Sequence, residues 1–370
     1  MARCRRCLLT DAIPDVNLDE DGVCNECREF RPEVYEPDPV TREQQQRQLD
    51  SILTRYKGRG AYDVLVGLSG GKDSAYLIYR LKEEYGLRVL AYSFDNGFLP
   101  PAALKNIRQT LDTLKVDHYM ARPSFDLLRK VYIYMLTRTS GSVILKLCPI
   151  CASFYGNIAK SVASKFNIPV VAFGYSREQD DPNFRIPRSR YYAFATQFMP
   201  RDLFDNVLNA DERAYLKEIY CDQVRKIMPN WLTRALAWEL PTSQFRFAIR
   251  KWPMVVAPYK VWGYNPDENK KKAIELGLLA DGKAHPLDTN CHLVPVMYYS
   301  DYKRQGWTVF VYELARLVRQ GKVDRSIWAK EFDQGDLEVE EGTFRKETVD
   351  YVLDRLGITR EQLTAKTAGG

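Results

Sequence analysis

The sequence contains no stretch that approaches the roughly 18 apolar residues of a membrane-spanning helix. Its first residues carry several arginines, where a secretory signal peptide would be apolar. No internal repeat is visible, so the chain is not an array of one repeated unit. We therefore expect a cytoplasmic protein that does not associate with membranes.

The chain also has little excess charge: 54 Lys and Arg residues face 48 Asp and Glu residues, for a formal net charge of +6. This mild excess suits an anionic small-molecule acceptor, such as a nucleotide or a sugar nucleotide, and does not by itself argue for nucleic acid. The 370 residues are 28% charged and 45% hydrophobic, which is typical of a globular protein of about two domains. The sequence leaves open whether the protein forms a homodimer.

One glycine-rich stretch joins a strand to a helix. Residues 62–68 are apolar and bounded by turn residues, and apolar residues at helical spacing place the start of a helix near Ser74. In such a turn the glycines allow a close backbone approach, while free N–H groups and the helix dipole point at an anion. We predict a nucleotide-phosphate site made of Ser69, Gly70, Gly71, Lys72, Asp73 and Ser74.

This stretch is not a Walker A loop, because Val66 and Asp73 occupy the positions of its first glycine and its Ser or Thr. SGGKDS after a strand instead resembles the PP-loop of the ATP pyrophosphatases, which grips the β,γ-pyrophosphate of ATP. The resemblance implies cleavage of ATP between its α- and β-phosphates and transfer of AMP to a substrate oxygen. Lys72 and Asp73 would be catalytic: Lys72 would neutralise the departing pyrophosphate, and Asp73 would hold Mg²⁺.

Strands and helices alternate along residues 62–174. This alternation predicts an α/β fold with a doubly wound parallel sheet, of the PP-loop, adenine-nucleotide hydrolase-like type that the resemblance implies. Ligands of such sheets bind beyond the carboxyl ends of the strands, so we expect Asp95 and Gly174 to border the nucleotide. The predicted strands are residues 62–68, 89–94, 117–120 and 170–174, and the predicted helices are 102–115, 125–137 and 153–166.

Two Cys-x₂-Cys pairs open the chain, with sixteen residues between them. Four thiolates at this spacing are typical of a structural zinc site, because each pair forms one knuckle and the two pairs complete a tetrahedron. Two disulfides are the alternative, which the expected compartment disfavours. We predict an N-terminal zinc ribbon with the ligands Cys4, Cys7, Cys24 and Cys27.

The sequence suggests four regions. Residues 1–40 form the zinc ribbon, 41–180 the PP-loop ATP-binding domain, and 261–370 a mostly helical C-terminal region. Residues 181–260 break the strand–helix alternation and are rich in arginine and aromatic residues. We interpret them as a helical insertion or lid over the active site.

A second cysteine set consists of Cys148, Cys151 and Cys291. We expect the first two at the start of the helix before the strand 170–174, where a helix N-terminus would lower a thiol pKa. The three thiols can bind three irons of a [4Fe–4S] cluster, form a redox pair plus a lone thiol, or be buried packing residues. We hypothesise that they converge near the α-phosphate end of the ATP site. Cys221 has no partner motif and is interpreted as packing.

Several segments together resemble the N-acetyl sugar amidotransferases of bacterial surface-polysaccharide biosynthesis. They are residues 4–8, 21–27, 69–74, 148–151, 165–169, 318–322 and 356–359. The resemblance implies adenylation of an N-acetyl carbonyl of a sugar nucleotide, followed by replacement of its oxygen with nitrogen. The ammonia would come from a partner glutaminase, and no glutaminase domain is visible in this chain.

The same cysteines and SGGKDS also resemble the iron–sulfur tRNA thiolases, which adenylate a base carbonyl and replace its oxygen with sulfur. In that case the acceptor would be tRNA, and Cys148, Cys151 and Cys291 would be catalytic through a cluster. The PP-loop cannot discriminate, because both reactions share the adenylated intermediate. The sequence favours nitrogen over sulfur, with ATP, Mg²⁺ and Zn²⁺ as the expected cofactors and a [4Fe–4S] cluster under the alternative.

Overall fold

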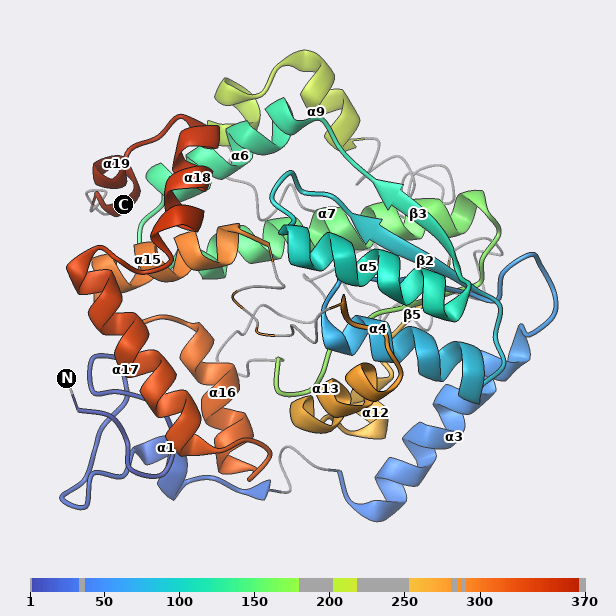
Figure 1. Cartoon of the computed structure of the whole chain (residues 1–370), viewed down its shortest axis with the longest axis horizontal. Helices are drawn as coiled ribbons and strands as arrows, with labels where there is room; N and C mark the ends of the chain where they lie inside the picture. Colours follow the sequence, from blue (N-terminus) through green and yellow to red (C-terminus); the bar gives the residue numbers. More distant parts are fainter. Residues whose placement is uncertain are drawn as a thin grey trace, which may run out of the picture.

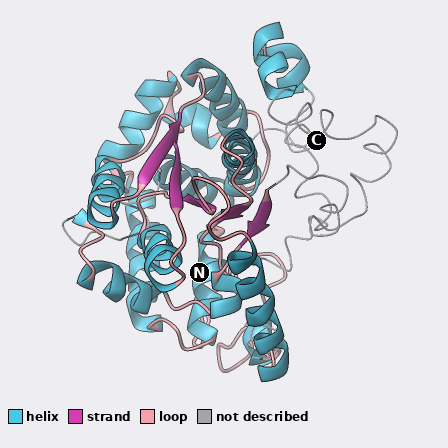
Figure 2. Ribbon diagram, turned by 90° about the vertical axis from the view of Figure 1, so that its right-hand side faces the viewer, coloured by secondary structure: helices cyan, strands magenta, loops and turns pink. Residues whose placement is uncertain are grey.

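The computed structural model describes residues 2–32, 37–179, 202–217, 253–280, 285, 287 and 291–365. Within these residues the centre of the molecule is a five-stranded sheet in the order β3-β2-β1-β4-β5 (Figures 1 and 2). Every neighbouring pair is parallel. The strands are β1 (Val64–Gly67), β2 (Val89–Phe94), β3 (Asp117–Ala121), β4 (Val170–Ala172) and β5 (Met254–Val256).

Alternation along β1 sends side chains to two separate layers of helices. Val64 and Val66 pack in one buried cluster with residues of α3 (Pro39–Arg55), α4 (Lys72–Tyr79) and α5 (Pro101–Leu114). Leu65 packs on the other face with residues of α7 (Ile144–Lys165). Figure 2 shows helices on both faces of the strands. The predicted α/β, doubly wound parallel sheet is therefore confirmed, and the chain reverses its direction of winding between β1 and β4.

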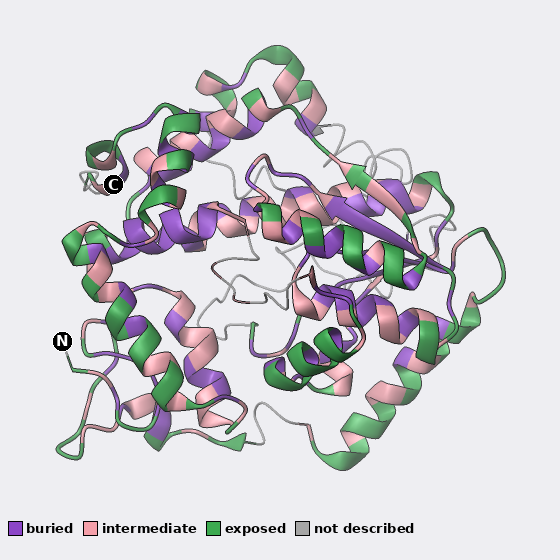
Figure 3. Cartoon of the chain, viewed as in Figure 1, coloured by how far each residue is buried: buried purple, intermediate pink, exposed green. Residues whose placement is uncertain are grey.

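A second buried cluster joins the two ends of the chain. It contains all four N-terminal cysteines together with residues of α6 and of the C-terminal helices. The helix α15 is its centre, because every residue from Leu293 to Tyr302 is buried (Figure 3). The cluster's helices include the start of α7 and also α6 (Phe125–Thr137), α15 (Leu293–Gln305), α16 (Phe310–Arg319), α17 (Arg325–Glu341), α18 (Lys346–Leu356) and α19 (Arg360–Thr364).

The remaining elements are short. They are α1 (Asn25–Arg28), α9 (Ala210–Lys217), α12 (Tyr259–Trp262), α13 (Pro266–Glu275) and two π-helical turns, η1 (Arg80–Glu84) and η2 (Leu203–Val207). The described helices include none that is long and apolar enough to cross a membrane.

One sequence-based helix boundary differs from the structure. The helix predicted at residues 153–166 begins at Ile144, so Cys148 and Cys151 lie inside it rather than at its start. The central sheet also contains residues 254–256, because β5 pairs with β4 across a long sequence gap. The greater part of the predicted insertion, and Cys221, lie outside the described residues.

Candidate active site

The loop between β1 and α4 has a conformation that requires glycine. Gly70 has φ +85°, and a Cβ on it would lie 2.4 Å from the carbonyl oxygen of Ala103 at the start of α5. The Asn106 amide of α5 donates to the Gly70 carbonyl at 2.9 Å, and its own oxygen accepts from the Ala280 N–H at 2.9 Å. The loop is therefore held against α5 before any ligand binds.

Hydroxyl groups brace the same loop from inside. Ser74 donates to the Gly71 carbonyl at 2.9 Å, and its Oγ lies 3.2 Å from both the N–H and the Oγ of Ser69. Gly71 is the N-cap of α4 and has no side chain to occupy the helix N-terminus. The N–H groups of the first turn of α4 are thus available for an anion in the place where the sequence predicted it.

We expect Gly70→Ala to abolish ATP binding and to destabilise the fold, because the added methyl group meets the Ala103 backbone. Gly58→Ala is the matched control: Gly58 also has a positive φ, of +80°, but a Cβ on it would have no atom within 4 Å. The control should lose only roughly 1–2 kcal/mol of unfolding free energy to left-handed strain. Calorimetric titration with ATP and chemical unfolding measure both effects. Equal losses in the two variants would contradict the close contact at Gly70.

Asp73 is the centre of a hydrogen-bond network that sequence reasoning missed. Its carboxylate lies 2.8 Å from the Lys72 ammonium, and it accepts from the Tyr264 hydroxyl at 3.1 Å and from the Asn269 amide at 2.9 Å. The Tyr259 hydroxyl donates to the Asp73 carbonyl at 2.9 Å. The tyrosines and the asparagine are 186 to 196 residues away along the chain, so no local motif pointed to them. The Asp73 carboxylate keeps a fixed orientation beside the loop.

A further carboxylate lies near Lys72 and Asp73. Burial raises the pKa of Glu313 on α16, the Lys72 charge lowers it, and the charges of Asp73 and Glu178 raise it. Gln179, in the segment after β4, donates to Glu313 at 3.3 Å. Glu313 is therefore an additional candidate site residue that no motif in the sequence indicated.

The two strand-end residues predicted to border the nucleotide both lie at the carboxyl edge of the sheet. Gly174 faces the Asp73 backbone, since a Cβ on it would lie 3.8 Å from the Asp73 carbonyl group. Asp95 follows β2, is buried, accepts from the Gly97 N–H at 2.8 Å and pairs with Arg122 at 2.5 Å. Asp95 is thus held by its own turn and by an arginine rather than exposed on a loop.

The three cysteines of the second set lie near enough to one another for the charge of one thiolate to affect the pKa of another. The Cys148 pKa is raised by burial and by the charges of Cys151 and Cys291, and the Cys291 charge raises the pKa of Cys151 as well. Cys148 also lies 3.9 Å from the Met297 sulfur on α15. The α7 helix is fixed to α15 just before this pair, because Asp301 accepts from Ser142 at 2.5 Å and from the Val143 N–H at 2.6 Å.

The expectation of low thiol pKa values is wrong for these residues. Burial raises the pKa of Cys151 to about 12, and it also raises that of Cys291. The α7 helix begins at Ile144, about one turn before Cys148 and about two turns before Cys151, so desolvation outweighs the helix dipole at both thiols. A bound cation or cluster would have to supply the positive charge that keeps these sulfurs ionised.

Contacts connect this thiol set to the end of β2. The Cys151 thiol is in hydrogen-bond contact with the Tyr132 hydroxyl, which donates to the Asn96 carbonyl at 3.2 Å. The Cys291 thiol contacts the side chain of the same Asn96. One turn after Cys151, Tyr155 packs directly against Gly67, two residues before the glycine-rich loop. The thiols therefore lie at the carboxyl edge of the sheet, where the strand ends and the loop also lie.

The four N-terminal sulfurs form a compact group of their own. They all lie within 4.8 Å of one another, and the residues are buried. The Cys4–Cys27 and Cys7–Cys24 sulfur distances of 3.8 and 3.6 Å exclude disulfides between them and fit four ligands of one ion. Backbone N–H groups of Arg6 and Leu9 point at the Cys4 and Cys7 sulfurs, as in a metal-binding knuckle. This donor set fits a zinc ion.

Comparisons with known proteins extend this description. No family model matches the chain. A probable sulfurtransferase of Methanocaldococcus jannaschii is 29% identical over 152 residues, which are 37% of this chain and 44% of that protein. The match therefore spans less than half of the relative's length.

Three solved structures are similar at low sequence identity. The U34-tRNA thiolase NcsA from Methanococcus maripaludis, with its [4Fe–4S] cluster, is 15% identical, with a TM-score of 0.33 over 88% of this chain and 90% of that one. An NH₃-dependent NAD synthetase from Campylobacter jejuni has a TM-score of 0.30, 14% identity and coverage of 52% and 97%. An NMN synthetase from Francisella tularensis has a TM-score of 0.27, 14% identity and coverage of 58% and 98%. Similarity at this level carries no argument about the reaction, and none of the four proteins is a sugar amidotransferase.

Proposed function

We propose that the protein uses ATP to adenylate a carbonyl oxygen of an acceptor and then replaces that oxygen with sulfur. The observation that carries this proposal is that Cys151 contacts Tyr132 and Cys291 contacts Asn96 at the end of β2, with Cys148 one turn before Cys151 on α7. This is the sheet edge that holds the glycine-rich loop. The probable-sulfurtransferase relative supports sulfur over the nitrogen that the sequence alone favoured.

The loop residues account for the first half of the reaction. The carbonyl oxygen of the acceptor attacks the α-phosphorus of ATP, AMP becomes bonded to that oxygen, and pyrophosphate leaves. Backbone N–H groups at the start of α4 and the Lys72 ammonium neutralise the charge that develops on the leaving pyrophosphate. Asp73 is held in place by Tyr264 and Asn269, and its carboxylate suits a Mg²⁺ ion that accompanies the phosphates.

The thiol set accounts for the second half. A sulfur nucleophile adds to the adenylated carbon, and AMP departs with the former carbonyl oxygen. Cys148, Cys151 and Cys291 would hold an iron–sulfur cluster, whose chemistry when bound is to present sulfur to that carbon. The site residues fit such a group by their chemistry, since cysteine sulfurs are the ligands of iron–sulfur clusters and two of these three thiols contact neighbouring side chains at the end of β2. Three sulfurs on separate irons also need not approach one another as closely as four ligands of one ion.

We expect Cys151→Ser, made and purified without oxygen, to lose its iron and inorganic sulfide while keeping about one zinc per chain. It should still release pyrophosphate with ATP and acceptor, but should form no thiolated product. Cys24→Ser is the matched control, since it should lose zinc and keep iron. Iron, sulfide and zinc analysis with mass spectrometry of the product measures these outcomes.

Two results would overturn the proposal. Native protein made without oxygen could contain zinc alone, or it could convert the adenylated acceptor with ammonia and not with sulfide. The second result would restore the amidotransferase interpretation, with a sugar nucleotide as acceptor and a partner glutaminase as the source of nitrogen.

A further inference from the structure

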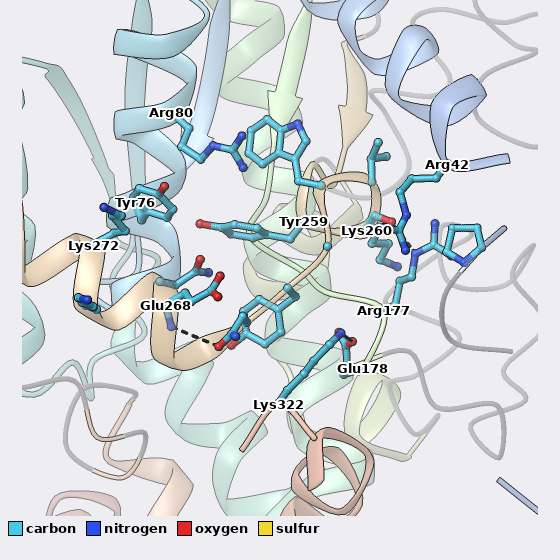
Figure 4. Close-up of a pocket in the computed structure, with 18 residues that line it drawn as sticks. Arg42, Tyr76, Arg80, Arg177, Glu178, Tyr259, Lys260, Glu268, Lys272 and Lys322 are labelled. Carbon is cyan, nitrogen blue, oxygen red and sulfur yellow. Dashed lines mark hydrogen bonds and ion pairs between the residues drawn. The ribbon is translucent and has the colours of Figure 1, made fainter. Parts of the chain in front are cut away.

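A pocket of about 550 Å³ opens beside α4, between α13 and the segments that follow β4 and β5 (Figure 4). Its lining contains seven cationic side chains and two carboxylates, Glu178 and Glu268. The cations come from opposite walls: Arg80 and Lys272 lie on one side, and Arg42, Arg177 and Lys260 lie on the other (Figure 4). A concave surface lined by one sign of charge concentrates ligands of the opposite sign.

Several of the cations that line the pocket form ion pairs, which reduce the positive charge of the pocket without removing it. Lys322 pairs with Glu178 at 2.8 Å, so it neutralises one of the two lining carboxylates. Arg80 pairs with Glu84, and Lys271 and Lys272 both pair with Glu275, so these cations are partly neutralised although neither glutamate lines the pocket. With these two glutamates included, seven cations face four carboxylates. The cavity therefore keeps an excess of positive charge.

An aromatic residue of the pocket, Trp262, positions one of the cations. The Arg80 guanidinium lies 3.8 Å above the Trp262 ring. Tyr85 stacks with the same ring at 5.7 Å and accepts a hydrogen bond from its N–H at 3.1 Å. The Trp262 ring therefore holds the Arg80 guanidinium at the wall of the pocket.

The pocket adjoins the glycine-rich loop without including it. Tyr264 and Asn269 line the pocket and also hold the Asp73 carboxylate, whereas none of the residues 69–74 is in the lining. A ligand in the pocket would thus contact the same side chains that orient Asp73.

We propose that this pocket is a second phosphate-binding site, which takes phosphate groups of the acceptor while the glycine-rich loop holds those of ATP. Its role for the acceptor rests on the proposed function, whereas phosphate binding by the pocket does not. The phosphates can come from a free nucleotide or from an RNA chain, because both present the same oxygens to the pocket's guanidinium and ammonium groups.

The test uses the full chain with the loop filled by a non-hydrolysable ATP analogue. Binding of two probes is measured: UDP by calorimetry and a fluorescent RNA stem–loop by anisotropy. Lys272→Glu and Lys260→Glu reverse charges on two different walls of the pocket. Lys270→Glu is the matched control, because Lys270 is exposed on the same helix α13 and does not line the pocket.

We expect both pocket variants to weaken binding of at least one probe tenfold or more, with less than a twofold change in Lys270→Glu and in affinity for the ATP analogue. The probe whose binding is weakened identifies whether the phosphate comes from a free nucleotide or from an RNA chain. Unchanged binding of both probes in the pocket variants, or an equal loss in Lys270→Glu, overturns the proposal. Failure of the proposed function is a separate result. In that case Lys272→Glu would still weaken probe binding, but no acceptor would cause ATP to release pyrophosphate.

Discussion

Replacing Lys72 by alanine is expected to reduce the formation of AMP and pyrophosphate by at least about 10²–10³-fold, because in the proposed reaction the ammonium group stabilises charge that develops on the leaving pyrophosphate. The fold should persist. Asp73 keeps its hydrogen bonds from Tyr264 and Asn269 when Lys72 is removed. Asp73→Asn should have a comparable effect on turnover, since it keeps the shape of the side chain and removes the charge that suits Mg²⁺.

Pyrophosphate release in the presence of acceptor measures both variants, and thermal unfolding confirms that they are folded. Lys82→Ala is the matched control, because Lys82 lies in the following π-helical turn and pairs only with Glu83 among the described ion pairs. Turnover within a few-fold of the native rate in folded Lys72→Ala would remove the loop from the reaction.

The second large effect concerns the N-terminal sulfurs. We expect Cys24→Ser to lose zinc and to cost on the order of several kcal/mol of folding free energy, because small four-thiolate modules fold only with their metal. The four sulfurs lie within 4.8 Å of one another, so the loss of one leaves the other three around an incomplete set of ligands.

The damage should extend beyond the first 32 residues. Arg325 on α17 donates to the carbonyls of Cys4 and Cys7 at 2.6 and 2.9 Å, and Arg3 pairs with Asp333 at 2.9 Å. Limited proteolysis should therefore cut both the N-terminal segment and α17 faster than in native protein. Cys148→Ser is the control, since it should keep zinc. Full zinc content with native protease resistance in Cys24→Ser would show that these sulfurs are not the metal ligands.

Short-range patterns in the sequence predicted the sheet and the loop correctly. Strand β2 begins and ends where its apolar run does, at Val89 and Phe94. The turn at Gly70 and the spacing of the N-terminal cysteines involve neighbours in the chain, and steric and covalent geometry limit the conformations of such neighbours. These features follow from composition and spacing alone.

The thiol chemistry shows where a local rule failed. Helix position suggested low pKa values for Cys148 and Cys151, but the helix starts earlier. In addition, Met297 of α15 packs against Cys148, and Tyr132 of α6 contacts Cys151. Burial depends on which distant helix packs there, and it changes the free energy of a charged sulfur more than the helix dipole does. A single sequence contains no signal for that packing.

The sequence by itself thus determined the α/β sheet, the glycine-rich turn and the four-cysteine spacing. Only the tertiary structure decided which side chains hold Asp73, how Cys291 approaches Cys151, and that cations from several elements line one pocket. The physical reason is the range of the interactions. Backbone sterics and periodicity act over a few residues, whereas the packing of α13 against α4 and of α15 against α7 joins segments more than 100 residues apart.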